Sequence, residues 1–538
     1  MKILRISLIA VITMLYSCDV SRVDVAPSNP TELEYFSDVS EFRLAAYGMY
    51  GQLVDLYASD HPDLNRSHGL FQLWRLPGDD LSVNNGAYNQ PELFNTSLNA
   101  QYDRTKAFWV TMYRLLQRTN VVIEKVETVD WSGYEGSEEI EAIAGEAHFL
   151  RGLAHYWLFQ MFGSVPIVTG RIVVASETNV PKSPAPEVLD QAIADLTLAE
   201  DLANESWSGT EIGRATKNSA RSLLVKALVT RANYYGSTAD YSTALTVFGR
   251  ITNELLPDFG EVFSAFNENH NESAFEWQAS SPTSGGGNFS LHNAGPWRGV
   301  EVMEHFRGND VSPTNPLVNQ SQAWTSDAKY VLTDKLVNLA GSDPRIAFWV
   351  APIAQGLILE KYTKDGYDFL GTRNYQSQNN ERFLRYGDIK LIAAEAALKS
   401  GSPGVAIGHI NDVRARASAW GATLVAGVDY DDSVNPTLTL PAPRNTAETD
   451  EATIMGWIME ERFIELASEG HRWYDLVRWH HAGDIDLTGW GHSDAHFSTN
   501  AILASSPVYF DVTKHLLFPI PQDEIDRNSA INENNPKY

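Results

Sequence analysis

The 538-residue chain contains a single cysteine, Cys18. Without a second cysteine, an intramolecular disulfide is excluded, and so is a zinc site built on several cysteines. Basic residues are also scarce, because 41 Lys and Arg stand against 68 Asp and Glu and leave a formal charge of −27. This balance argues against nucleic acid as a partner and provides no general attraction for anionic polymers, so it favours a neutral ligand.

The chain also lacks the local motifs of the common enzyme classes. It has no nucleophile elbow, phosphate loop or dinucleotide fingerprint in a suitable context, and no HExxH pair of histidines. We therefore expect no catalytic residue, no cofactor and no metal centre. Paired carboxylates for glycoside hydrolysis are not excluded by the sequence, because 68 acidic residues bring some carboxylates together in any fold.

The N-terminus has the pattern of an export signal over residues 1–17. Lys2 and Arg5 precede the apolar run Ile6–Leu15, which is too short for the roughly 20 residues that a membrane-spanning helix needs. Cys18 follows this signal pattern directly, at the place where bacterial lipoproteins carry their acylated cysteine. Tyr16, two positions before the cysteine, is bulkier than the small residue usual at that position. We expect cleavage before Cys18 and lipidation of it, which stably anchors the chain to a membrane. The alternative is an ordinary cleaved signal.

Residues 18–36 contain Pro27 and Pro30 and show no apolar periodicity, so we interpret them as the lipidated N-terminus and a flexible tether. Residues 37–538 are expected to form a single domain. With 43% hydrophobic residues, the chain has enough apolar material for a large core.

Apolar residues at intervals of three or four predict that this domain is mainly helical. Between residues 138 and 162 more than one face is apolar, so this helix should be packed between neighbours, and Gly163 should end it. Short links between successive helices predict antiparallel pairs, as in a tetratricopeptide-like scaffold, although no regular 34-residue repeat is present. The helices expected from this pattern are Glu138–Phe162, Glu187–Asn204, Lys217–Tyr235, Tyr241–Leu255, Phe383–Lys399 and Val405–Ala419.

The scaffold is thus predicted over about 103–255 and 381–480. Two long segments, about 59–101 and 271–378, lack helical periodicity, and a smaller insertion rich in Gly, Pro and Asp covers 421–450. The segment 271–378 carries many aromatic residues, which disordered segments rarely do. Because ordered irregular segments on a rigid scaffold are where binding residues usually lie, we expect the ligand site in the two long segments.

Several sequence blocks resemble the SusD/RagB family, and they occur in the family's order. They are LPGDDLSVN at 76–84 followed by an early helix at 109–126; GEAHFLRGLAHYWLFQMFGSVPIV at 145–168; Asp343, Pro344 and Arg345 followed by a helix with Arg385, Asp388, Ala394 and Glu395; ERFIELASEGHRWYDLVRW at 461–479; and the closing segment 516–538. The block at 461–479 is the most specific of them.

The resemblance implies a SusD-like fold and a surface-exposed lipoprotein of the bacterial outer membrane. It implies a lid on a SusC-like, TonB-dependent barrel, with a ligand site that faces this transporter. The cargo implied is an oligosaccharide or polysaccharide, or a peptide as in the RagB branch. A surface glycosidase is a third hypothesis.

The charged block at 461–479 is interpreted as structural rather than catalytic. Glu461 and Glu465 are four residues apart and share one face of a helix, and Gly470 should end that helix. Arginine and carboxylate pairs at such a corner are usually structural ion pairs. Arg151, in the earlier helix, is interpreted in the same way.

Two other polar clusters are weighed as metal sites. His480 and His481 are adjacent, and adjacent residues rarely chelate one ion, so a solvated turn is favoured. Asp429, Asp431 and Ser433 alternate as in a calcium loop, but the glycine and closing glutamate of an EF-hand are missing. The sequence leaves a structural calcium open without favouring it.

The ligand residues are chosen from composition and position, because sugar rings stack on aromatic faces while their hydroxyls pair with polar side chains. Trp74 is expected to be a core residue instead. The expected ligand-binding residues are Asn84, Asn85, Tyr88, Asn89 and Phe94 in the first segment, and Phe289, Trp297, Arg298, Trp324 and Tyr375 in the second.

Overall fold

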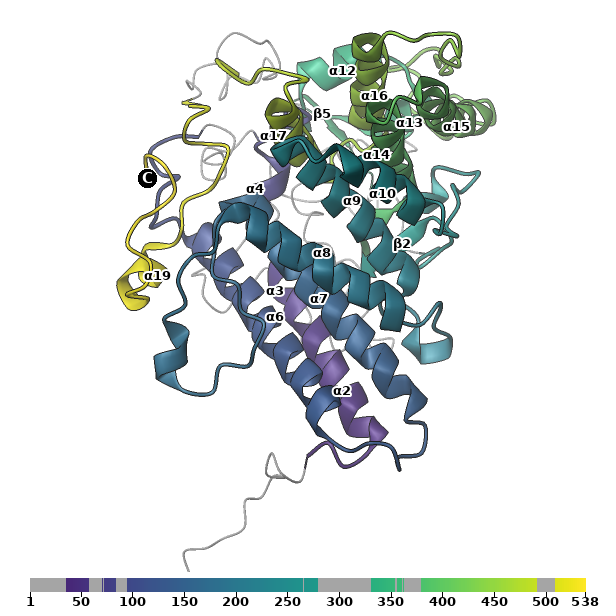
Figure 1. Ribbon diagram of the computed structural model, residues 1–538. Coiled ribbons are helices and arrows are strands. Elements are labelled where there is room, and N and C mark those ends of the chain that lie inside the picture. The colour runs from purple at the N-terminus through teal and green to yellow at the C-terminus, as the bar shows by residue number, and fades with distance from the viewer. Residues whose placement is uncertain are drawn as a thin grey trace, which may run out of the picture.

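The fold was analysed in a computed structural model (Figure 1). The structure describes residues 35–57, 70, 72–83, 94–264, 266–278, 330–353, 356–359, 361, 379–490 and 509–538. The signal, Cys18 and most of the tether predicted for 18–36 lie outside these residues. As the sequence predicts, the protein is mainly helical, with a few short strands.

Long helices form one half of the molecule. The N-terminal helix α2 packs against α6 and α7, and α7 packs in turn against α8 (Figure 1). The residue bounds are Val39–Tyr50 for α2, Asp103–Thr128 for α6, Glu138–Phe162 for α7 and Ala185–Leu202 for α8; the short helices α3 and α4 cover Val54–Tyr57 and Gln72–Arg75.

Helix α7 has the bounds that the sequence predicts. It is buried on nearly every side, because α2, α6 and α8 surround it, and Gly163 ends it with a φ of 68° that a side chain would strain. Gly145 lies where α7 meets the end of α8, and a Cβ atom there would overlap the backbone of Ala203. Glycine therefore allows the two helices to approach closely.

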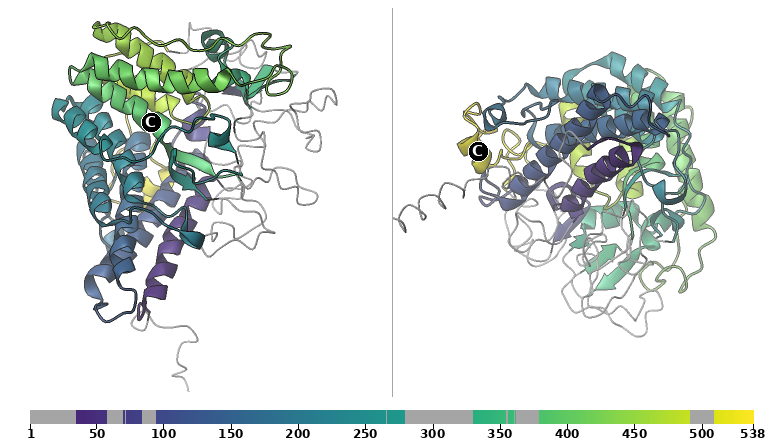
Figure 2. Two further views of the ribbon diagram at one scale, coloured as in Figure 1. Left: turned by 90° about the vertical axis from the view of Figure 1, so that its right-hand side faces the viewer. Right: turned by 90° about the horizontal axis from the view of Figure 1, so that it is seen from below.

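A second set of helices lies at the other end of the molecule, where residues 386–465 are drawn in green in Figure 2. Helix α9 packs against α8, α10 and α17, and α14 packs against α10, α15 and α16. The bounds are Lys217–Tyr235 for α9, Thr238–Phe248 for α10, Asp334–Ala340 for α12, Pro344–Ala347 for α13, Tyr386–Lys399 for α14, Pro403–Gly421 for α15, Glu451–Glu465 for α16 and Arg472–Ala482 for α17. The short helix α19, Gln522–Arg527, lies apart from this set, near the start of α6 (Figure 1).

Two helix predictions are wrong in part. Helix α10 ends at Phe248 rather than Leu255, because Asn253 Nδ2 donates to the carbonyls of Asn271 (2.8 Å) and Ser273 (3.1 Å) and ties the following segment to another part of the chain. Residues 383–385 are not helical either. They belong to strand β6, whose residues pair with β2.

The described strands form three antiparallel pairs, β1 with β3, β2 with β6 and β4 with β5. The bounds are Leu81–Val83 for β1, Ser273–Trp277 for β2, Tyr330–Leu332 for β3, Val350–Ile353 for β4, Gly356–Leu359 for β5 and Glu381–Arg385 for β6. None of the described helices is both long and apolar enough to cross a membrane.

The C-terminal segment 516–538 packs on the end of α7. The amide of Phe518 donates to the carbonyl of Met161 (2.7 Å), and Nδ2 of the buried Asn535 donates to the carbonyls of Phe162 (3.0 Å) and Phe518 (2.7 Å). The carbonyls at a helix end have no partner within the helix, so these contacts satisfy them. The family-like block at 516–538 thus caps the C-terminal end of α7, which belongs to the block at 145–168. We call this contact the C-terminal clasp.

Candidate ligand-binding site

The two segments in which we expect the ligand site are joined by a pair of strands. Strand β1 belongs to the first segment and β3 to the second, and Val83 lies opposite Tyr330. Because the pair is antiparallel, the chain after Val83 and the chain before Tyr330 leave it at the same end. Val83 and Tyr330, which border residues 84–93 and 279–329, therefore lie side by side although 247 positions separate them in the sequence.

The two ends of the second segment also lie next to each other in space. Trp277, the last residue of β2, lies opposite Glu381, the first residue of β6. Glu381 forms a buried ion pair with Arg75 of the first segment, and Arg75 Nη1 donates to the carbonyl of Ser468 (2.8 Å). One buried contact thus links the first segment, the return of the second, and the block at 461–479.

Asp79 of the LPGDD block makes a second link of this kind. Its carboxylate accepts from Arg472 Nε (2.5 Å) and from Lys335 Nζ (2.6 Å), and its carbonyl accepts from Thr333 Oγ1 (2.6 Å). Burial alone would raise the pKa of Asp79, but the charges of Arg472 and Lys335 outweigh it and hold the pKa well below its usual range. The Asp79 carboxylate is therefore ionised, and both of its oxygens are engaged in ion pairs.

The neighbouring Asp80 has a different environment. It is buried, and its Oδ2 accepts from the backbone amide of Ser468 (2.8 Å). Burial, together with the negative charge of Asp79, raises the pKa of Asp80 to about 6. Two adjacent carboxyl groups thus differ because only Asp79 accepts hydrogen bonds from cationic side chains, whereas Arg472 acts on Asp80 only through its charge.

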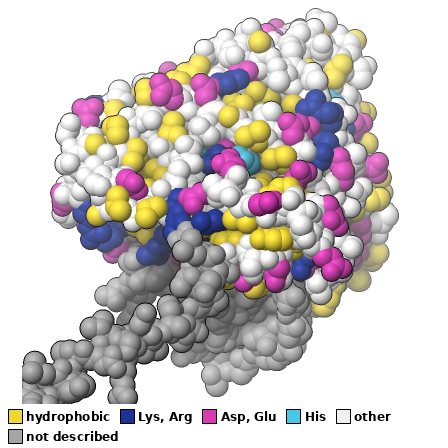
Figure 3. Space-filling model, turned by 60° about the horizontal axis from the view of Figure 1, so that its bottom comes forward, with side chains coloured by type: hydrophobic (Ala, Val, Ile, Leu, Met, Phe, Trp, Pro, Cys, Tyr) yellow, Lys and Arg dark blue, Asp and Glu magenta, His cyan; other side chains and the backbone are white. Residues whose placement is uncertain are grey.

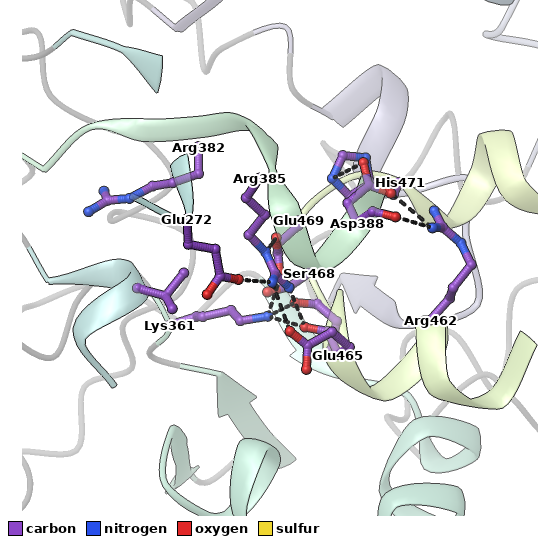
Figure 4. A network of polar contacts seen from close by, with 12 residues as sticks. Glu272, Lys361, Arg382, Arg385, Asp388, Arg462, Glu465, Ser468, Glu469 and His471 are labelled. Atoms are coloured by element: carbon purple, nitrogen blue, oxygen red, sulfur yellow. Dashed lines mark hydrogen bonds and ion pairs between the residues drawn. The ribbon is translucent and has the colours of Figure 1, made fainter. Parts of the chain in front are cut away.

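A larger network of buried charges lies beneath these links (Figure 4). At its centre, Glu465 accepts from Arg345 (3.0 Å), Arg385 (2.7 Å) and Arg416 (2.5 Å). Burial would raise the pKa of Glu465, but the three guanidinium groups hold it far below its usual range. Arg385 also donates to Glu469 through Nε (2.6 Å).

Lys361, also buried, completes this network. Its Nζ donates to the carbonyls of Glu465 (3.0 Å) and Ala467 (3.1 Å) and to the Glu469 carboxylate (2.5 Å). Burial lowers the pKa of Lys361 to about 8, although Glu469 opposes the effect.

Next to this network, Asp388 binds Lys226 Nζ (2.6 Å) and Arg462 Nη1 (2.9 Å). Burial would raise the pKa of Asp388, but these cations hold it well below its usual range. The same burial and the charge of Lys226 lower the pKa of His471 to about 4, so this histidine is neutral near pH 7. We call this largely buried assembly the charge platform; its residues are Arg75, Asp79, Asp80, Lys226, Glu272, Lys335, Arg345, Lys361, Glu381, Arg385, Asp388, Arg416, Glu461, Arg462, Glu465, Glu469, His471 and Arg472.

The charge platform is an assembly of ion pairs. Apart from Asp80, its carboxylates are paired with arginine or lysine, which confirms that the block at 461–479 forms structural ion pairs. Arg151 is confirmed in the same role, because it donates to Asp195 at 2.7 Å. A cavity beside Trp74, Glu381 and His471 has a volume of about 60 Å³, far below the several hundred Å³ of a typical small-molecule site.

Of the ten expected ligand residues, only Phe94 is described. Its side chain is 2% exposed and packs against Trp473, Trp490, Phe510 and His515 at ring-centroid distances of 5.1 to 5.9 Å. Phe94 is therefore a core residue, and we do not carry it into the proposed site. The other nine lie outside the described residues. Trp74, expected in the core, is 5% exposed and packs against Trp157.

The two polar clusters weighed as metal sites are placed as follows. His480 and His481 lie in the last turn of α17 rather than in a loop, and the His481 ring stacks on Tyr234 at 4.1 Å. Asp431 accepts from the amide and hydroxyl of Ser433, as in a tight turn. Within the described residues, no three His, Cys, Asp or Glu side chains gather as a metal would require.

The surface charge is mixed on the face drawn in Figure 3. Acidic and basic side chains lie in small groups there, with hydrophobic side chains between them, and form no extended field of one sign. This distribution agrees with the absence of a general attraction for a polyanion.

Comparison with known protein families shows to which family the chain belongs. Residues 271–538 match the family described as "SusD family", and residues 68–229 match one described as "Starch-binding associating with outer membrane". The two matches together include all of the charge platform, the whole of the second segment and residues 68–101 of the first. The chain belongs to the SusD family.

Relatives of this SusD-family protein match it over most of their length. SusD-like protein P2 of Formosa agariphila is 25% identical, and the match covers 100% of both chains. A SusD-like protein of Bacteroides ovatus is 21% identical, with 83% of this chain and 84% of the relative covered.

Solved structures of SusD-like proteins share the fold. A laminarin-binding SusD-like protein superposes with a TM-score of 0.69 at 21% identity, covering 93% of this chain and 100% of the other. A SusD homologue from Bacteroides thetaiotaomicron gives a TM-score of 0.70 at 20% identity, covering 95% and 99%. Surface glycan-binding protein A from Bacteroides fluxus gives 0.68 at 21% identity, covering 93% and 100%. These likenesses confirm the predicted SusD-like, mainly helical fold.

Proposed function

We propose that this SusD-family protein captures a neutral oligosaccharide or polysaccharide at the cell surface and delivers it to a SusC-like, TonB-dependent transporter without chemical change. The observation that carries the proposal is the pairing of β1 with β3, because it holds Val83 and Tyr330, which border the aromatic and amide-rich stretches 84–93 and 279–329, side by side. The charge platform holds this strand pair in place. A rigid base lowers the entropy cost of ordering a loop around a ligand.

The names of the relatives support a glycan as cargo. One structural neighbour is named for laminarin binding and another for surface glycan binding, and one family match is named for starch binding at the outer membrane. The sequence adds Tyr88, Trp297 and Trp324 as possible stacking platforms, each with asparagine or arginine nearby. Affinity should be modest, since a protein that hands its ligand on must also release it.

The experiment that tests this function is affinity electrophoresis of the chain without residues 1–18, in gels that contain neutral or anionic polysaccharides. We expect one neutral polymer to retard the protein, and Tyr88→Ala or Trp297→Ala to abolish the retardation. Matched controls are Tyr235→Ala, an exposed tyrosine at the end of α9, and Trp457→Ala, a partly buried tryptophan of α16. If no polymer retards the protein, the glycan proposal fails and peptide becomes the leading cargo.

We also propose that the protein binds the glycan without cleaving it. Incubation with the polymer that retards it should release no reducing ends over many hours. Steady release that is proportional to the protein concentration would instead identify a glycosidase.

The membrane anchor and the partner require tests in cells. The acyl chains proposed on Cys18 should carry the protein into the outer-membrane fraction, and Cys18→Ala should release it to the soluble fraction. We further expect the lipidated protein to co-purify from this membrane with a TonB-dependent barrel, because tethering raises the effective concentration of each partner. Purification of the protein alone would contradict that part of the proposal.

A further inference from the structure

A polar pocket of about 330 Å³ is lined in part by the start of the second segment, Asn271 and Ser273–Glu276, but none of its described lining residues is an expected ligand residue. It is lined by the chain between α8 and α9, the start of α9, Asn253, residues 269–271 and strand β2. Its described lining residues belong neither to 84–93 nor to 279–378. The volume falls at the lower end of the roughly 300 to 1,000 Å³ typical of small-molecule sites.

Four asparagines line this pocket, namely Asn218, Asn253, Asn269 and Asn271. Asn271 has an exposed side chain, and the Asn253 side chain is nearly buried. The Oδ1 atom of Asn253 and the hydroxyl of Ser273 are both buried and have no hydrogen-bond partner among the described residues. Unpaired buried polar atoms cost free energy, which a small adjustment around a hydroxylated ligand would recover.

Trp207 adds an aromatic wall whose orientation is fixed. Its Nε1 donates to the carbonyl of Ala215 (2.9 Å), and the guanidinium of Arg214 lies 3.7 Å from the ring centroid. An indole held in this way presents its remaining surface with little loss of side-chain entropy, as a stacking platform for C–H groups requires.

The charges around the pocket argue against an anionic ligand. Arg214 is committed to Glu139 (2.7 Å), Glu146 and Glu211 (2.9 Å). His270 Nε2 lies 3.0 Å from the carbonyl of Val262, and its Nδ1 accepts from the amide of Ser273 (3.2 Å). Burial lowers the pKa of His270, which keeps the ring neutral. The described lining thus offers the side-chain amide of Asn271, the Asn253 Oδ1 atom, hydroxyls, one indole and the carboxylates of Glu205 and Glu276, but no uncommitted cation.

We propose that this pocket binds one neutral sugar residue and forms a second glycan contact, separate from the loop site. The ligand class follows from the lining alone, because amides both donate to and accept from hydroxyl groups while the indole takes the C–H face of a ring. Two separate contacts on one polymer raise its overall affinity without making either contact tight.

The test uses methyl glycosides of glucose, galactose, mannose and xylose as probes, with saturation-transfer NMR on the chain without residues 1–18. To remove the loop site, the protein carries Tyr88→Ala and Trp297→Ala. We expect millimolar binding of at least one glycoside, and a loss of about tenfold or more on adding Trp207→Ala or Asn271→Ala. The Asn271 variant retains the backbone carbonyl to which Asn253 donates.

Trp457→Ala is the matched control, because Trp457 is also partly buried with an arginine, Arg444, 5.4 Å from its ring centroid. This variant should bind the glycoside normally. The proposal is overturned if no glycoside binds, or if binding survives both Trp207→Ala and Asn271→Ala. Failure of the loop site would appear separately, as lost polysaccharide retardation with glycoside binding intact.

Discussion

Asp79 and Arg472 are 393 positions apart in the sequence, yet Arg472 Nε donates to Asp79 Oδ1 at 2.5 Å. Asp79 belongs to the LPGDD block, and Arg472 begins α17 in the block at 461–479. The contact joins the first loop segment to the charge platform. It explains why two distant blocks of the family pattern occur together in one protein.

Asp79→Asn should lower the free energy of unfolding by about 3 to 5 kcal/mol at pH 7, because it leaves the charge of Arg472 buried without its partner. The pKa of Asp79 is depressed in the folded protein, so the carboxylate stabilises the fold above its unfolded pKa of about 3.8 and loses this effect as the pH falls. The difference between parent and variant should therefore shrink in acid, as urea denaturation from pH 3 to 7 would measure.

The control for this variant is Asp523→Asn. Asp523 also lies 2.6 Å from a lysine, Lys106, but both side chains are exposed to solvent. Solvent screens such a pair, so the control should change the unfolding curve very little. Equal effects of the two variants would argue against a special role for the charge platform.

Glu268→Gln should stabilise the protein in alkaline solution. Burial and the nearby charge of Glu276 raise the pKa of Glu268 from 4.5 to about 8, so the folded protein holds a proton that the unfolded chain has released. Stability from this group is present below pH 4.5 and is lost as the pH rises through 8. The glutamine retains the oxygen that accepts from the amide of Asn380 (2.6 Å).

Denaturation of this variant from pH 4 to 9 should show an advantage over the parent that grows with pH and vanishes below pH 4.5. The exposed Glu135→Gln serves as control and should follow the parent throughout. An advantage for Glu268→Gln that is constant with pH would contradict the assigned pKa.

Two alanine substitutions of helical glycines should have opposite effects. Gly145→Ala places a methyl group against the backbone of Ala203 and should cost about 1 to 3 kcal/mol, because α7 and α8 have to move apart. Gly408→Ala, in α15, meets nothing within 4 Å and should gain up to about 1 kcal/mol from helix propensity. Thermal unfolding of the two variants under one condition tests both signs.

Asn535→Ala should destabilise the protein by about 1 to 3 kcal/mol, because it leaves the carbonyls of Phe162 and Phe518 buried without a donor. Asn532→Ala, an exposed asparagine three positions earlier, is the control and should have little effect. Chemical denaturation distinguishes the two, and equal stabilities would show that the C-terminal clasp is dispensable.

The sequence predicts the elements that are determined locally. Helices α7 and α9 have the predicted bounds because apolar periodicity and a following glycine, Gly163 or Gly236, specify them within one stretch of chain. The helix predicted from Phe383 starts three residues too early, because residues 383–385 belong to β6, which is defined by its partner β2, more than 100 positions earlier. The charged residues of β6 look exposed in the sequence, yet Arg382 and Arg385 are buried among partners supplied by other segments.

For the candidate site, too, the sequence predicts what is determined locally and not the contacts between distant segments. Composition identified the two loop segments, but nothing local indicates that β1 pairs with β3 or that Asp79 and Lys335 meet. The buried packing of Phe94 was missed because its partners Trp473 and Phe510 come from the last part of the chain. The amide pocket around Asn253 was missed as well, since its asparagines come from separate segments.

The clasp at the C-terminus has a consequence for biogenesis. The last turn of α7, at the centre of the helical half, receives hydrogen bonds from Phe518 and Asn535, which lie more than 350 positions later in the sequence. A chain cut before Phe518 cannot complete this helix terminus. The helical half therefore gains these hydrogen bonds only after residues 518–535 have been synthesised, and copies that lack them should remain open to proteolysis.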